Sequence, residues 1–512
     1  MWGIGWNPPA KPSKKAKGKL PAAKARIHLA AKLTGAGLKS IPGRTARLKA
    51  IYLLQIAAEI EHALMVQYLY AAYSLNERFA EGRDDRLHSI VTRWKRDIRT
   101  VARQEMAHLI TVQNLLLALG AEANLDRENN FLLHPDAYPF PVRFEPLSLR
   151  SLAKYVVTES PELNEIDSRR DRKMLKQAME LAKSDLVKIN RVGVLYVALY
   201  WLFLRHDEST GPWKTHSSLA SFVKDADLLG VHIQEEDFAS IPMFASFEAT
   251  PEEWGVFEKD MKVSETDPRS KALAAIHWIM MQGEGPVGKR SAKGQGEDDS
   301  HFKKFLIMFE EFKRHQRLLR GAVRDVPENP LATDQRRAGV PRGFRNTITE
   351  PEAKLWAQLF NNRYQMLLID ILLALSTNRH KDPELRETLL DWGVVHEMKY
   401  LQVIGQILPT LHRHSGSKDV AGAPFETAEI PADAAKRWDM QRVLMKGSGH
   451  LTRQIRKTTG RAQEALAVLD DIQTFDAVRL PTVLKNCKAP TKKYEWRSGK
   501  VSRVAPEGSV NA

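Results

Sequence analysis

The chain has 512 residues and a formal net charge of +15, with 43% hydrophobic and 8% aromatic residues. This composition is typical of a soluble globular protein with a large packed interior. No stretch approaches about 18 uninterrupted apolar residues, which excludes a membrane-spanning helix. Cys487 is the single cysteine, which excludes an intrachain disulfide framework and Cys-rich zinc or iron–sulfur sites. We therefore expect a cytoplasmic protein.

Positive charge is concentrated at the two ends of the sequence. Residues 1–49 contain twelve Lys or Arg and no acid, and residues 484–512 contribute a net charge of +5, which leaves about −2 for the rest. Such biased segments are typical of solvated chain, and we predict basic flexible tails over residues 1–45 and 481–512. Contact with an acidic partner, nucleic acid or an anionic membrane is the alternative. The composition of the first tail also resembles an organelle transit peptide.

Between the tails the apolar spacing is helical, and the strict alternation of exposed strands is almost absent. Helices are predicted in a first set over residues 47–77, 87–119, 149–159, 171–204, 268–281 and 300–320. After a linker rich in Pro, Asp and Arg, a second set covers residues 351–376, 383–409, 432–445 and 461–474. The order predicts an all-α protein, with a helical bundle over residues 46–325 and a C-terminal helical region over residues 349–480 that packs on it.

The second predicted helix has one apolar stripe, interrupted by two polar residues. Glu105 and His108 lie in the middle of this stripe, between Val101 and Val112. Burying an unpaired carboxylate costs several kcal/mol, and a bound metal removes that cost. Glu-x-x-His puts both groups on one helix face, which is the spacing used by ferritin-like two-metal bundles. The pattern predicts two metal ligands, and a hydrogen-bonded core pair is the alternative.

The first predicted helix has a similar stripe with Glu61 at its centre, followed one turn later by Met65 and Tyr68. His62 lies on the neighbouring face, as a competing ligand or as a donor that orients Glu61. Carboxylate and imidazole ligands suit iron or manganese, while copper and zinc stay open as alternatives. The pattern predicts Glu61 as a third ligand and Tyr68 as a neighbour of the site.

A two-metal bundle needs further ligands from two other helices. Glu284 follows an apolar helix in Gln282-Gly-Glu-Gly, and His301 begins the next helix in Ser300-His-Phe. Spacing alone favours a solvent-facing loop acid and an ordinary histidine at a helix start. Both residues are therefore candidates that need support from another source.

That support comes from a resemblance to a known family. The sequence from Gln55 to Ala71, QIAAEIEHALMVQYLYA, resembles the opening helix of the ferritin-like domain of the iminophenyl-pyruvate dimer synthase family. Further segments resemble that family in the same order over about residues 50–430: Glu105-Met-Ala-His, Asn114-Leu-Leu-Leu-Ala-Leu-Gly, Glu159-Ser-Pro-Glu, Gln282-Gly-Glu-Gly, Ser300-His-Phe, Tyr364-Gln-Met-Leu-Leu and Ala421-Gly-Ala-Pro-Phe-Glu.

The resemblance implies a ferritin-like bundle in which Glu284 and His301 join the other ligands, and Glu159 is a further ligand or a neighbouring acid. It also implies coupling of two imines derived from aromatic amino acids in bisindole pigment pathways, after a flavin-dependent amino-acid oxidase, which is a candidate partner. One position departs from the family. Val194 stands where the third helix of such proteins often carries an acid, which predicts one tightly and one loosely bound metal.

Two functional hypotheses follow. The first is a metal-dependent oxidoreductase with two iron or manganese ions, acting on a small amino-acid-derived amine or imine in natural-product biosynthesis. The alternative is a non-catalytic ferritin-like binding or delivery protein that docks through its basic tails to a partner, a membrane or nucleic acid. The sequence indicates neither the substrate nor the oligomeric state.

Overall fold

A computed structural model describes most of the chain between residues 43 and 503. The described residues are 43–77, 79, 85–127, 143–161, 163, 166–182, 191–205, 232–257, 261, 267–284, 300–319, 321–333, 346–458, 463–487, 494–497 and 500–503. All but the last three residues of the predicted N-terminal tail lie outside this part of the chain. Among the described helices, none has the length and apolar content needed to cross a membrane.

Two long antiparallel helices, α2 (Ala46–Ser74) and α4 (Asp85–Ala118), form the centre of the molecule. The Thr45 side chain caps the start of α2 by accepting from the backbone N–H of Leu48, which satisfies one of the free donors of the first turn. Gly120 follows the end of α4 with φ +63°, a left-handed conformation that favours glycine. The helix predicted over residues 87–119 therefore ends within one residue of its predicted end.

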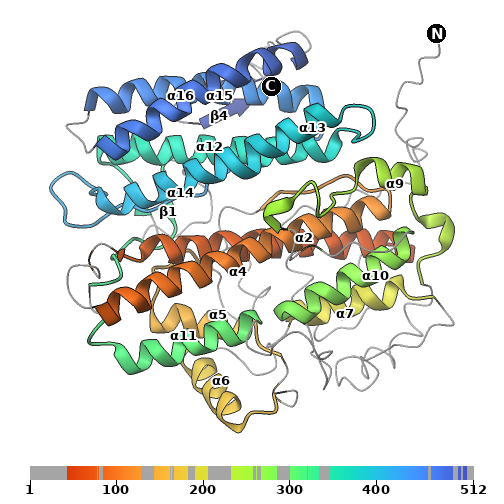
Figure 1. Cartoon of the computed structure of the whole chain (residues 1–512), viewed down its shortest axis with the longest axis horizontal. Helices are drawn as coiled ribbons and strands as arrows, with labels where there is room; N and C mark the ends of the chain where they lie inside the picture. The colour runs from red at the N-terminus through yellow and green to blue at the C-terminus, as the bar shows by residue number, and fades with distance from the viewer. Residues whose placement is uncertain are drawn as a thin grey trace, which may run out of the picture.

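Two pairs of helices cover one face of α2 and α4, and the C-terminal helices cover the opposite face (Figure 1). One pair is α5 (Leu149–Thr158) with α11 (His301–His315). The other is α7 (Arg191–Phe203) with α10 (Pro268–Ile279), which continues into a π-helical turn, η8 (Met280–Glu284). The remaining helices of the bundle are short or peripheral: α6 (Arg169–Ala182), η6 (Glu235–Asp237), α9 (Ile241–Phe247) and η7 (Gly255–Phe257).

The prediction of one long helix over residues 171–204 is wrong. In its place α6 packs on α5 and α11, whereas α7 packs on α2 and α10. Their burial differs accordingly, because α6 buries only a narrow stripe, whereas α7 buries most of its described side chains. The sequence of α6 is mostly polar and suits the surface, whereas that of α7 is mostly apolar and suits the core. One continuous helix would not place both in these surroundings.

The C-terminal block is helical, as predicted. It contains α12 (Pro351–Ser376), α13 (Pro383–Leu390), a π-helical segment η11 (Asp391–Glu397), α14 (Met398–Ile407), η12 (Leu408–Thr410), α15 (Ala434–Thr458) and α16 (Gln463–Asn486). Four short strands form two pairs, one parallel and one antiparallel: β1 (Pro330–Leu331) with β2 (Asn346–Thr347), and β3 (Tyr494–Arg497) with β4 (Lys500–Arg503). The all-α prediction is therefore confirmed.

Two predicted boundaries in this block are wrong. Helix α15 continues past residue 445 through two glycines, and Gly447 is buried in it. Helix α16 runs past residue 481, the predicted start of the second tail, with Pro481 inside it. Arg479 and Val483 are both fully buried, and this tertiary anchoring outweighs the local cost of a proline.

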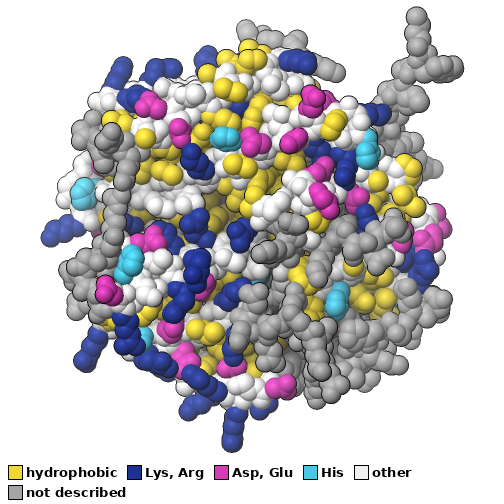
Figure 2. Space-filling model, viewed as in Figure 1, with side chains coloured by type: hydrophobic (Ala, Val, Ile, Leu, Met, Phe, Trp, Pro, Cys, Tyr) yellow, Lys and Arg dark blue, Asp and Glu magenta, His cyan; other side chains and the backbone are white. Residues whose placement is uncertain are grey.

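The basic residues of the described surface are unevenly distributed. In Figure 2, Lys and Arg side chains gather at the lower left, over α6 and α11 of the same view in Figure 1. The exposed members on these two helices are Arg169, Arg170, Lys173, Lys176, Lys313 and Arg314. Positive charge is therefore not confined to the two ends of the chain, although the net charge of the body is close to zero.

Candidate metal centre

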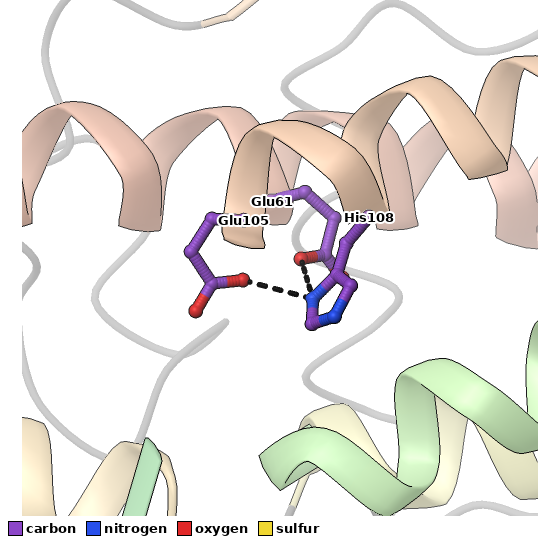
Figure 3. A group of neighbouring side chains, drawn as sticks. All are labelled: Glu61, Glu105 and His108. Carbon is purple, nitrogen blue, oxygen red and sulfur yellow. Dashed lines mark hydrogen bonds and ion pairs between the residues drawn. The ribbon is translucent and has the colours of Figure 1, made fainter. Parts of the chain in front are cut away.

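Helices α2 and α4 bring three of the predicted ligands together. Glu61 comes from α2, and Glu105 and His108 come from α4, one turn apart (Figure 3). The Nδ1 atom of His108 lies 3.1 Å from Glu105 Oε2 and 3.5 Å from Glu61 Oε2. All three side chains have zero solvent exposure. The core of the sequence prediction is thus one compact group in space.

A second group forms on the other side of Glu105. Glu159 is the residue at the C-terminal end of α5, and His301 is the first residue of α11, after the capping Ser300. The Nδ1 atom of His301 lies 3.0 Å from Glu105 Oε1 and 3.4 Å from Glu159 Oε2. Each oxygen of Glu105 therefore faces a different imidazole. We call Glu61, Glu105, His108, Glu159 and His301 the acid–histidine cluster.

Each outer carboxylate of the cluster has a tyrosine partner. The Tyr196 hydroxyl, from α7, donates to Glu61 Oε1. The Tyr68 hydroxyl, from α2, donates to Glu159 Oε1. Both hydroxyls bind the oxygen other than the one near the imidazole, which fixes the orientation of each carboxylate and leaves Oε2 directed at the centre.

Each imidazole of the cluster has a glutamine partner. The Gln282 Oε1 atom, from η8, lies 2.6 Å from His108 Nε2, and Gln104 Oε1 lies 3.1 Å from His301 Nε2. A glutamine carbonyl can only accept a hydrogen bond, so both contacts place the proton on Nε2 of a neutral ring. The Nδ1 lone pairs then face the carboxylate oxygens, as metal ligands would.

Several buried atoms at the centre lack hydrogen bonds. They are Glu61 Oε2, Glu105 Oε1, Glu159 Oε2 and His301 Nδ1. Potential ligand atoms lie within 4.8 Å of one another in two groups, Glu61–Glu105–His108 and Glu105–Glu159–His301. Buried acceptors that face one another are costly unless a cation lies between them. The residues therefore fit a pair of metal ions that share Glu105.

Without metal, protons must supply the missing positive charge. Burial raises the pKa of Glu61 to about 7. Burial also disfavours a charged imidazole at His301, but Glu105 and Glu159 outweigh it and raise the pKa of that ring to about 9. The pKa of His108 is likewise raised, against its burial, by Glu105 and Glu61. Burial opposes ionisation of Glu105, yet the two imidazoles lower its pKa below the ordinary range.

Two predicted site residues are not placed in the cluster. His62 Nδ1 lies 3.1 Å from the Leu125 carbonyl oxygen, and its Nε2 hydrogen-bonds the Tyr364 hydroxyl of α12. The expectation that His62 orients Glu61 or competes as a ligand is therefore wrong, because both ring nitrogens are engaged at the seam with the C-terminal block. Glu284 ends η8, and its side chain lies outside the described part of the structure, as does that of Val194.

The sequence pattern does not predict the two glutamine partners of the cluster, Gln104 and Gln282. For Tyr196 it favours packing over a place beside the site, and the structure shows that its hydroxyl binds Glu61. Gln104 is 6% exposed, but its position next to Glu105 gives no periodic signal. Gln282 belongs to the Gln282-Gly-Glu-Gly segment, in which only the acid is an expected ligand type. Such contacts form only where side chains from different helices pack together, and local sequence spacing does not show that packing.

Comparison with known proteins now adds to this geometry. The Ferritin-like family profile matches residues 54–310, which include all five residues of the acid–histidine cluster. The chain is similar to dichlorochromopyrrolate synthase of Lentzea aerocolonigenes, with 24% identity over 427 residues. This alignment covers 76% of the chain but 37% of the relative, so the chain spans little more than a third of that protein. No solved structure matches significantly. The extent of the profile match shows that the chain belongs to the Ferritin-like family.

Proposed function

We propose that the protein is a metalloenzyme with a two-metal site in the acid–histidine cluster. The observation that carries the proposal is the shared Glu105, whose two oxygens each face one imidazole and one further carboxylate. Three carboxylates and two imidazoles are a donor set that suits iron or manganese, with copper as a further candidate. Ferritin-like two-metal proteins place such ligands on facing helices.

The residues divide naturally between two metal positions. Glu61 and His108 would hold one ion, Glu159 and His301 the other, and Glu105 would contact both. Through the family resemblance, Glu284 stays a candidate for an additional ligand. The bound metals would supply redox chemistry with dioxygen or peroxide, or polarise an imine as Lewis acids.

The surrounding side chains would fix the tautomer and the orientation of the metal ligands. Gln282 and Gln104 keep the imidazole protons on Nε2, so that Nδ1 is available without a change of tautomer. Tyr196 and Tyr68 hold the two outer carboxylates. The cluster itself is fully buried, and exclusion of water strengthens every electrostatic contact within it.

For the substrate, we propose a small amine or imine derived from an amino acid, as part of natural-product biosynthesis. Two findings support this class. The ordered motifs resemble the iminophenyl-pyruvate dimer synthase family, and the chain is similar to dichlorochromopyrrolate synthase. A flavin-dependent amino-acid oxidase is then the class of partner that would supply the imine.

Metal binding is tested first. Chelator-treated protein is reconstituted anaerobically with Fe(II), Mn(II) or Cu(I), and bound metal is measured by equilibrium dialysis and elemental analysis. We expect two ions per chain in the wild type and a loss of at least one in Glu105→Ala. If none of these metals binds to the folded wild type, the proposal is abandoned. Admission of oxygen, followed by absorption, then separates redox chemistry from Lewis-acid chemistry.

Turnover is tested with the metal-loaded protein. It is incubated with an aromatic L-amino acid and a flavin-dependent L-amino-acid oxidase, and mass spectrometry follows the products. We expect coupled or oxidised imine products that the oxidase alone and the folded Glu105→Gln variant do not form. Metal binding with no such product from a panel of amino acids would leave the site intact and contradict the proposed substrate class.

A further inference from the structure

The two halves of the acid–histidine cluster contain the same types of side chain, but the residues that surround them differ in solvent exposure. In each half a carboxylate binds a tyrosine and an imidazole binds a glutamine. The two tyrosines are fully buried, and Gln104 is 6% exposed. Gln282, in contrast, is half-buried, as is the preceding Met281. Among the described contacts of the cluster, the one nearest to solvent is therefore Gln282.

The half that contains Glu159 and His301 is closed by aromatic rings. The Tyr68 ring lies 4.9 Å from the rings of both Tyr155 and Phe305, measured between centroids, and the latter two are 5.2 Å apart. All three rings are at most 1% exposed. A mutually packed aromatic trio leaves little room for a small molecule to pass.

Among the described residues, the contact that brings the Glu61–His108 half nearest to solvent is Gln282. Gln282 lies in the middle of η8, and its amide oxygen is 2.6 Å from His108 Nε2. A molecule that displaces the Gln282 side chain would therefore be one residue away from the imidazole of His108. At the equivalent position of the other half, Gln104 is enclosed within α4.

We propose that exogenous ligands, the amine or imine substrate included, reach the cluster past Gln282 and bind at the Glu61–His108 half, while the Glu159–His301 half takes no outside ligand. This inference rests on the proposed two-metal site. It assigns unequal roles to two halves of equal composition, one for contact with the substrate and one for holding its metal. It also makes Gln282, which has both a donor and an acceptor, a polar group of the described structure that an entering amine meets before His108.

The test uses azide as the probe and a size series at position 282. The Co(II)-loaded full chain is mixed with azide, and the change in visible absorption gives the association rate. We expect Gln282→Ala to raise this rate and Gln282→Phe to lower it, each by roughly fivefold. Gln104→Ala is the matched comparison, because it removes the equivalent contact in the closed half, and its rate should change much less than that of Gln282→Ala.

The outcomes separate this inference from the proposed function. Metal stoichiometry is measured before azide is added, and loss of all metal binding in the wild type overturns both proposals. If two ions bind but the azide rate does not follow side-chain size at position 282, or responds equally at Gln104, only the inference fails. Absence of any azide complex in the loaded wild type also overturns it. Circular dichroism checks each variant. If the Phe variant does not fold, Gln282→Asn completes the size series, with an azide rate expected between those of the wild type and Gln282→Ala.

Discussion

The protein buries two groups of charged side chains, and they are built in opposite ways. In the C-terminal block, Arg363, Asp370, Glu397, Asp476 and Arg479 form what we call the arginine–acid network. Arg363 binds Glu397 at 2.6 Å and Asp476 at 2.8 Å, and Arg479 binds Asp370 at 2.9 Å. In the described structure, no Lys or Arg pairs with a carboxylate of the acid–histidine cluster, where the only counter-charges are imidazoles.

The difference shows how a structural network can be told from a metal site. A guanidinium is permanently charged and donates up to five hydrogen bonds, so Arg363 and Arg479 supply two fixed positive charges to the three acids of the network. Burial raises the pKa of Asp370 to about 8, so a proton can balance the third acid. An imidazole balances a carboxylate only by keeping a proton. The acid–histidine cluster therefore depends on protons or metal ions for all of its positive charge, whereas the arginine–acid network carries most of its positive charge in its own two arginines. Four of the five network residues are fully buried, as are all five residues of the acid–histidine cluster, so burial of charge alone does not identify a site.

The largest effect is expected in the arginine–acid network. Arg479→Met leaves Asp370 without its arginine, while Glu397 keeps Arg363, and the uncompensated buried acid should lower the free energy of unfolding by about 3–5 kcal/mol. The loss should be the same with and without metal, because the network does not contact the cluster residues. Urea denaturation followed by circular dichroism measures it. A stability equal to that of the wild type would mean that the network contributes nothing to the fold.

The next effect belongs to the cluster and should depend on metal. Ions that bind only the folded state stabilise it, by about 2.7 kcal/mol at a concentration one hundred times the dissociation constant. We expect Glu105→Gln to abolish most of this gain, while the metal-free variant unfolds at a urea concentration equal to or above that of the wild type. A large loss of stability in the metal-free variant would instead make Glu105 a structural residue, like those of the arginine–acid network.

Metal affinity should also depend on pH. In the metal-free cluster the pKa of Glu61 is raised to about 7 and that of His301 to about 9. Below these values the groups hold protons that a metal must displace, so the apparent affinity should fall as pH decreases, by about tenfold per pH unit for each proton released. Titration with Mn(II) between pH 6 and 9 measures the slope. A flat profile would indicate that the metal binds without displacing these protons.

The sequence predicts the part of the site that lies on regular helix faces. Glu105 and His108 interrupt an apolar stripe, and this pattern survives in the structure because both residues occur in the middle of α4. Glu159 and His301 lie at helix ends, where no periodicity distinguishes them, and only the family resemblance identified them. Whether Glu61 or His62 faces the cluster depends on which face of α2 packs against α12. The sequence of α2 alone does not indicate that face.

The same limit applies to the fold. Helix α12 was predicted with the bounds that the structure has, because its apolar pattern is continuous and Pro351 begins it. Helix α16 was predicted to end much earlier, because Pro481 and the nearby basic residues are typical of a tail. Arg479 holds that stretch in the helix through partners in α12 and η11. Such long-range pairing is invisible to local sequence patterns.

The smallest effect concerns the tyrosines, and it tests whether the two halves of the cluster are equivalent. Tyr196→Phe removes the donor to Glu61, and Tyr68→Phe removes the donor to Glu159. Each loss should weaken metal binding in its own half by about 1 kcal/mol, or roughly fivefold in affinity.

Stepwise titration with Mn(II), followed by electron paramagnetic resonance, resolves the two affinities. Tyr196→Phe should change one step and Tyr68→Phe the other, since each tyrosine contacts one outer carboxylate. If both variants weaken the same binding step, each half does not hold its own metal ion. The two halves would then share the same residue types without sharing the same role.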